Sequence, residues 1–136
     1  MNKKTYEYSL EEKKENLVHI IKNTQILGAA FEKQKKYFCA DFMTDDMADD
    51  WDSFAFFAIN LNNQKVISNQ TFQTINKINN NFQIVSYKQP KYEEAIWTLE
   101  GLENHPFWEE QRKLAKELLV MLEEDLKRIE KQRNRF

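Results

Sequence analysis

The sequence predicts a mainly α-helical protein, a compact bundle of four to five helices. Only two glycines and two prolines occur among 136 residues, whereas sandwiches, barrels and Rossmann-type folds use many more of them in turns. Apolar residues also recur at helical spacing along most of the chain. No change in composition marks a linker, so we expect a single helical domain over residues 1–136.

The first helix is expected over about residues 10–36. Ser9 and Glu12 have the spacing of a capping box, in which each side chain accepts a hydrogen bond from the other residue's backbone N–H. Apolar residues follow at intervals of three and four, with lysines and glutamates between them. Any bend is expected near Gly28.

A second helix is expected to follow Thr44, which suits an N-cap. Asp45 and Asp46 in its first turn would complement the positive end of the helix dipole. Beyond Ser53 apolar residues cover nearly every face, so this helix should be central in the core with its acidic turns at the surface. Its inner stripe comprises Met47, Trp51, Phe54, Ala58 and Leu61.

Residues 60–89 leave two structures open. Thirteen of them are asparagine or glutamine and none is acidic, and such sequence favours turns and caps in either structure. Apolar spacing through Ile75 and Ile78 favours a helix, whereas the segment from Phe82 to Tyr87 resembles a strand. The alternative fold class is therefore α+β, with a small sheet or hairpin within residues 60–89.

Two helices are expected after Pro90. The first is short and should end near Gly101, and the second begins at His105-Pro106, since proline favours an early helical position. The inner stripe of the second comprises Leu114, Leu118, Met121, Leu122 and Ile129. Three large aromatic residues lie where these two helices meet, and they are expected to pack in the core. If one of them is exposed, the spacing indicates that it is Trp108. The three residues are Trp97, Phe107 and Trp108.

The most informative feature for function is an acidic window. Six of the seven aspartates fall between Asp41 and Asp52, and no lysine or arginine occurs from Tyr37 to Gln64. Carboxylates interleaved with aromatic residues suit a basic protein partner, because charges steer association and aromatic residues supply binding energy. We expect solvent-facing carboxylates, with Trp51 or a neighbouring aromatic residue as the anchor. The carboxylates are those of Asp45, Asp46, Asp49, Asp50 and Asp52.

Several function classes are not expected. A formal net charge of −2 disfavours a nucleic-acid binder, and no apolar stretch approaches the length of a membrane span. The lone Cys39 excludes an internal disulfide, and no secretory signal is evident, so we expect a cytoplasmic protein. The histidines, His19 and His105, are too few for a zinc cluster, so no cofactor and no metal are expected.

Two acidic strings nevertheless match motifs of metal-dependent enzymes. Residues 45–49 read DDxxD, the string that binds magnesium in prenyl-diphosphate enzymes, and residues 11–15 read EExxE, as in all-helical nucleotide pyrophosphatases. Glu12 is better explained as the capping partner of Ser9, and helix-start chemistry or a partner-facing surface is the better explanation of the DDxxD string. No nucleophile or phosphate-binding motif accompanies them. We therefore do not expect an enzyme, and a hydrolase with an acidic metal site is kept as an alternative.

In size, acidity, helix content and Asn/Lys-rich composition, the whole chain resembles small cytoplasmic immunity proteins that neutralise bacterial toxins. The resemblance is one of general character, so no site residues are transferred. It implies a protein inhibitor that binds a basic toxin, for example a nuclease, through the acidic and aromatic surface. The alternative is an adaptor or secretion-type chaperone that binds a partner segment in an apolar groove between helices.

Overall fold

The computed structural model describes residues 7–37 and 43–133 of the chain. Cys39 and Asp41 lie outside the described residues. Six α-helices and a short 3-10 helix form this part of the chain, and the described ranges contain no strand, which confirms the mainly α prediction. The elements are α1 (Leu10–Leu27), α2 (Phe31–Tyr37), α3 (Met43–Asn63), α4 (Asn69–Ile84), η1 (Glu94–Trp97), α5 (Leu99–Asn104) and α6 (Pro106–Arg133).

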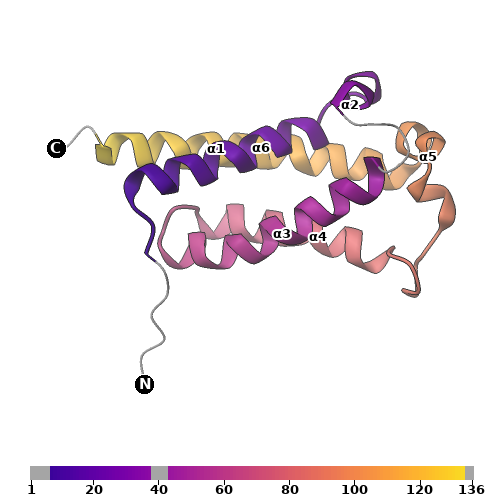
Figure 1. Ribbon diagram of the computed structural model, residues 1–136, viewed down its shortest axis with the longest axis horizontal. Coiled ribbons are helices and arrows are strands. Elements are labelled where there is room, and N and C mark those ends of the chain that lie inside the picture. The colour runs from indigo at the N-terminus through magenta and orange to yellow at the C-terminus, as the bar shows by residue number, and fades with distance from the viewer. Residues whose placement is uncertain (1–6, 38–42, 134–136) are drawn as a thin grey trace.

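The four long helices form an antiparallel bundle (Figure 1). Helix α1 packs mainly on α6 and helix α3 mainly on α4, while α4 and α6 join the two pairs. Successive long helices alternate in direction, as in up-down-up-down bundles. A short turn connects α3 to α4 at one end, whereas the two longer connections, which carry α2 and η1–α5, lie together at the other end.

The core is built from the apolar stripes that the sequence predicts. The predicted α3 stripe is confirmed, since all five of its side chains are buried. Four of the five predicted α6 stripe residues are also buried, and Met121 is half-buried. Two polar residues complete the α4–α6 contact: the buried Gln111 donates to the carbonyl of Ile78 at 3.0 Å and accepts from Asn81 at 3.1 Å. Its amide is thus satisfied inside the core.

Helix α1 begins as predicted and ends earlier than predicted. Ser9 and Glu12 form the capping box, with N–O distances of 3.0 and 3.2 Å. The expectation of one helix over residues 10–36 is wrong, because α1 ends at Leu27, with Gly28 as its C-cap, and α2 begins at Phe31. The buried amide of Gln34 on α2 donates to the carbonyls of Ile26 and Leu27. This side chain satisfies carbonyls that a continuous helix would have paired with backbone N–H groups.

The hairpin alternative within residues 60–89 is wrong, because α4 occupies most of that range. Ser68 caps the helix and accepts from the backbone N–H of Thr71 at 3.1 Å. Ile75, Ile78 and Phe82 lie on one face and are completely buried. Lys65 adopts a φ of 61° in the turn before α4, a backbone conformation that asparagine-rich and glycine-rich turns commonly use.

Two expectations for the segment after Pro90 are also wrong. Trp108, expected to be the most exposed of the three aromatic residues, is fully buried and donates from its indole N–H to the carbonyl of Ile96 at 2.7 Å. Gly101 lies inside α5 instead of ending a helix. A Cβ at this position would overlap the carbonyl oxygen of Ala95. Glycine is thus needed here for close packing of α5 against η1, not for termination.

Candidate protein-binding surface

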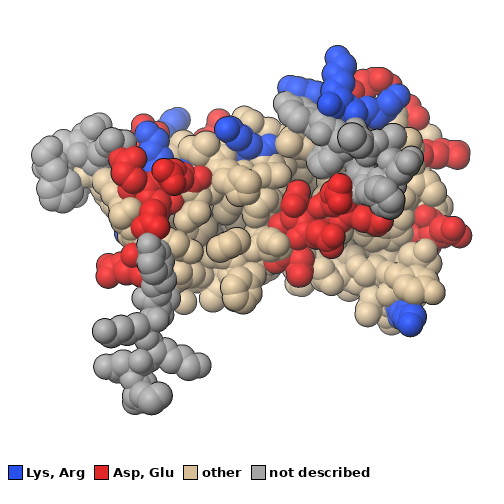
Figure 2. Space-filling model, viewed as in Figure 1, with Lys and Arg blue, Asp and Glu red and all other residues tan. Residues whose placement is uncertain are grey.

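Helix α3 carries every predicted site residue, and it presents them on different sides. Asp45, Asp46, Asp49 and Asp52 are exposed, and Asp50 is half-buried. Figure 2 shows acidic side chains gathered over the amino-terminal half of α3. The helix itself contains no lysine or arginine. The predicted exposure is therefore confirmed for four aspartates and is only partial for Asp50.

The expectation that Trp51 anchors a partner at the surface is wrong for this residue. Its side chain is 1% exposed and packs edge to face on Phe54, with ring centroids 5.4 Å apart. Trp51 lies one helical turn from Met47 and two turns from Ala58 on the same stripe, and that stripe faces the core. Helical periodicity therefore separates this tryptophan from the neighbouring aspartates.

The half-buried Asp50 lies at the edge of α3 that faces α1. Burial raises the pKa of its carboxyl group above the ordinary value. The nearby carboxylates of Asp46 and Asp49 raise this pKa further, while His19 on α1 opposes the shift. His19 also packs edge to face on Phe54, with 5.6 Å between centroids. The acidic surface therefore ends at a partly desolvated carboxylate beside a histidine.

Two of the predicted aspartates line a groove that the sequence did not predict. Asp45 and Asp49 form one side of this groove, which has a volume of about 650 Å³. The other side comes from the loop after α4, from η1 and from Thr98, which follows η1. We call this feature the acidic groove, and its further lining residues are Ala48, Ser86, Tyr87, Tyr92, Glu94, Trp97 and Thr98.

Three aromatic rings form the far side of the acidic groove. Tyr87 is 71% exposed and Tyr92 is 36% exposed, and their rings meet edge to face at 5.4 Å. The half-buried Trp97 connects this side to the core through Phe82. The ammonium group of Lys88 lies 5.7 Å from the centroid of Tyr87, a distance at which a cation is attracted to a ring face.

One hydrogen bond joins the two sides of the acidic groove, and a second fixes η1 to the end of α4. The hydroxyl of Thr44 donates to the carbonyl of Trp97 at 3.0 Å, and the indole N–H of Trp97 donates to the carbonyl of Val85 at 3.0 Å. The prediction that Thr44 is the N-cap of the second helix is wrong, because α3 begins at Met43 and the Thr44 hydroxyl is used in this tertiary contact. The start of α3, the end of α4 and η1 are thus fixed to one another.

Sequence reasoning missed Tyr87, Tyr92 and Glu94 because they are about forty residues from the aspartates and lie on a loop and a short 3-10 helix. One signal was present. Two tyrosines flank the Lys-Gln-Pro-Lys segment between them, and aromatic residues in a polar loop without apolar neighbours are seldom needed for the core. The other missed feature is a buried aspartate, Asp125, whose contacts are structural.

The described residues contain no group of three or more His, Cys, Asp or Glu side chains placed to hold a metal ion. The aspartates of the DDxxD string are spread along the exposed side of α3, and Glu12 of the EExxE string belongs to the capping box of α1. His105 accepts from the backbone N–H of Phe107 through Nδ1 at 3.0 Å, so it supports the start of α6. The arrangement offers charge and aromatic surface to a partner.

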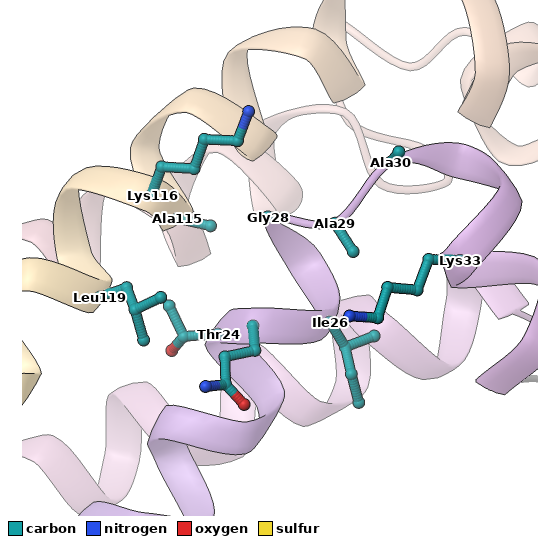
Figure 3. Close-up of a pocket in the computed structure, with 10 residues that line it drawn as sticks. Thr24, Ile26, Gly28, Ala29, Ala30, Lys33, Ala115, Lys116 and Leu119 are labelled. Carbon is teal, nitrogen blue, oxygen red and sulfur yellow. The ribbon is translucent and has the colours of Figure 1, made fainter.

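Four further depressions lie on the described surface, and Figure 3 shows the one at the α1–α2 break. It has a volume of about 470 Å³, and its wall comes from the end of α1, the start of α2 and one turn of α6. Among the described residues that line it, only Lys33 and Lys116 are charged. None of these described lining residues carries a carboxylate, so this depression differs in chemistry from the acidic groove.

Comparison of the chain with protein-family models, with curated proteins and with solved structures finds no match in any of the three. Within the described residues, no helix has the length and apolar character needed to cross a membrane.

Proposed function

We propose that this protein is a stoichiometric protein inhibitor of the toxin-immunity or antitoxin kind, which blocks a basic toxin, for example a nuclease. The observation that carries this proposal is the acidic groove, which Asp45, Asp49 and Glu94 line together with two exposed tyrosine rings. The proposed partner is a protein, and the proposed location of the complex is the cytoplasm. Neither nucleic acid nor a cofactor is part of this function.

The chemistry of the acidic groove supports a cationic ligand group. Among the residues that the structure describes, no lysine or arginine forms an ion pair with the three groove carboxylates. An entering lysine or arginine side chain would meet both negative charge and the faces of aromatic rings. Lys88 already places its ammonium group near Tyr87, which supports the use of this ring by a cation.

The rigidity of the acidic groove supports tight association. Hydrogen bonds through Thr44 and Trp97 hold its two sides before any partner arrives. A surface that is already ordered loses little conformational entropy on binding. Carboxylates on such a surface accelerate association by long-range attraction, and this attraction weakens as salt increases.

Affinity capture from the source organism at low salt tests the proposal, followed by kinetics with the purified partner. We expect a basic protein whose activity is abolished at a one-to-one ratio. An Asp45→Asn/Asp49→Asn variant should associate at least tenfold more slowly at low salt and show a weaker salt dependence. The matched control is Glu123→Gln/Glu124→Gln, which removes two exposed carboxylates from α6. Equal association rates for both variants would disprove the proposed role of the groove.

A further inference from the structure

The carboxyl-terminal half of α3 leaves three large apolar side chains in water. Phe56 is 75% exposed, Phe57 is 50% exposed and Ile59 is 51% exposed. The two phenylalanine rings contact each other edge to face at 6.4 Å. Phe56 lies on the side of the helix opposite the buried stripe through Phe54 and Ala58. Adjacent exposed apolar groups of this size are a typical feature of interaction sites.

The apolar residues repeat the positions of the aspartates two helical turns further along α3. Phe56 follows Asp49 by seven residues, Phe57 follows Asp50, and Ile59 follows Asp52. Seven residues bring a side chain back to nearly the same side of a helix, about 10 Å along its axis. In Figure 2, uncharged surface accordingly adjoins the acidic patch over α3.

The two edges of this surface are fixed by neighbouring helices. Asp52 accepts a hydrogen bond of 3.4 Å from Asn79, so this edge and Ile59 lie toward α4. Asp50 is close to His19, so that edge and Phe57 lie toward α1. We call the surface between them the α3 face. It runs from Asp49 to Ile59, with its acidic half before its apolar half.

We infer that the α3 face binds an amphipathic basic helix of a protein partner. The apolar side chains of that helix would cover Phe56 and Phe57, and its lysines or arginines, two turns away, would lie over Asp49 and Asp52. Exposed phenylalanines that become buried supply the larger part of the binding energy, while the charge pairs set orientation and association rate. This inference rests on the proposed function, because it describes the kind of segment that a basic partner presents.

Charge complementarity selects this occupant over a second copy of the chain. A parallel pair of α3 faces would bring aspartates against aspartates, and an antiparallel pair would bring aspartates against phenylalanines. Both arrangements desolvate carboxylates without a cation, which is costly. A helix with cations at one end and apolar side chains at the other satisfies both halves of the face.

Two synthetic helical peptides with the same lysine, leucine and alanine composition test the inference. In the first, leucines occupy one half of a helical face and lysines the other half, two turns away. In the second, the same residues are scrambled. Fluorescence anisotropy at low salt should show binding of the first peptide, at least tenfold weaker binding of the scrambled one, and at least tenfold weaker binding of the first peptide by a Phe56→Ser/Phe57→Ser variant.

Val120→Ser is the matched control, because Val120 is 59% exposed on α6, outside the α3 face. It should bind the first peptide as the unchanged protein does. Thermal unfolding followed by circular dichroism checks the fold of each variant. If the double variant is unfolded, the single variant Phe56→Ser, which alters the most exposed of the three side chains, takes its place.

The outcomes separate this inference from the proposed function. The inference is overturned if the first peptide does not bind, if it binds the serine variant equally well, or if sedimentation shows a dimer that Phe56→Ser dissociates. An Asp49→Asn/Asp52→Asn variant is measured in parallel. If the asparagine variant binds the first peptide more weakly and the serine variant binds it normally, the inference fails. The binding role of the α3 aspartates is then retained. If neither variant changes binding, the α3 face has no role.

Discussion

The buried carboxylate of Asp125 on α6 accepts a hydrogen bond of 2.6 Å from the hydroxyl of Thr71 on α4. Arg128 contacts the other oxygen of this carboxylate at 2.9 Å and also donates to the carbonyls of Lys65 and Val66. The α3–α4 turn is thereby attached to α6. Asp125 is the aspartate outside the acidic window, and its role is structural.

We predict that Asp125→Ala lowers the free energy of unfolding by about 1–3 kcal/mol, because the buried Thr71 hydroxyl loses its carboxylate partner. Urea denaturation measures this loss. Glu124→Ala, at the adjacent exposed position, should change stability by less than about 0.5 kcal/mol. Equal effects of the two substitutions would show that the network does not stabilise the fold.

Replacement of Trp108 tests the core at the joint of α5 and α6. The fully buried indole packs edge to face on Phe82 and Phe107. Trp108→Ala is expected to destabilise the protein by about 3–5 kcal/mol, since it leaves a cavity and an unpaired carbonyl at Ile96. Thermal unfolding provides the measurement, and Tyr87→Ala, at an exposed ring, is the control. A tryptophan fluorescence spectrum typical of an indole in water for the Trp97→Phe/Trp51→Phe protein would contradict this burial.

The two glycines should respond to alanine in opposite ways. Gly101→Ala is expected to lower the free energy of unfolding by about 1–3 kcal/mol, because the new methyl group overlaps the backbone carbonyl of Ala95. Gly28→Ala should be neutral or stabilise by about 0.4–1 kcal/mol, since its φ of −81° suits alanine and the nearest atoms are 3.4 Å from the added carbon. Chemical denaturation of both variants makes the comparison. Helix propensity alone would predict a gain at both positions, so a gain at Gly101 would contradict the packing seen here.

The raised pKa of Asp50 predicts a pH dependence of stability. Its causes are burial first and the neighbouring Asp46 second. Between the ordinary aspartate pKa of about 4 and the raised value, the native state binds more protons than the unfolded state, so stability falls as pH rises. Asp50→Asn should therefore stabilise the protein at neutral pH, and this gain should vanish below about pH 4.

Urea denaturation of the wild type and of Asp50→Asn at several pH values measures the effect, with Glu117→Gln on the exposed side of α6 as the control. A constant difference between wild type and Asp50→Asn across the whole range would rule out the titration of Asp50 as its cause.

Local rules predicted much of the fold. The Ser9–Glu12 capping box, the buried stripe of α3 and the start of α6 at Pro106 depend on residues within one or two helical turns of each other, and all three are present. Three of the errors share a cause. The amide of Gln34 donates to the carbonyl of Leu27 at the end of α1. The hydroxyl of Thr44 donates to the carbonyl of Trp97, and the indole N–H of Trp108 donates to the carbonyl of Ile96. Each of these contacts is made by a side chain to a backbone carbonyl in another element.

The site shows the same division. The sequence placed the aspartates at the start of α3 and predicted their exposure, and helical periodicity also predicts that Trp51 faces inward with Met47 and Phe54. It did not predict the groove, since Tyr87, Tyr92 and Glu94 come from another part of the chain.

The sequence by itself determined the helical class, the main apolar stripes and an acidic segment without lysine or arginine. These features depend on composition and on a period of 3.6 residues, which act over a few neighbouring positions. Only the tertiary structure decided which aromatic residues accompany the acids at the surface. That outcome depends on how α3, the loop after α4 and η1 pack together, and hydrogen bonds and burial between distant residues fix this packing.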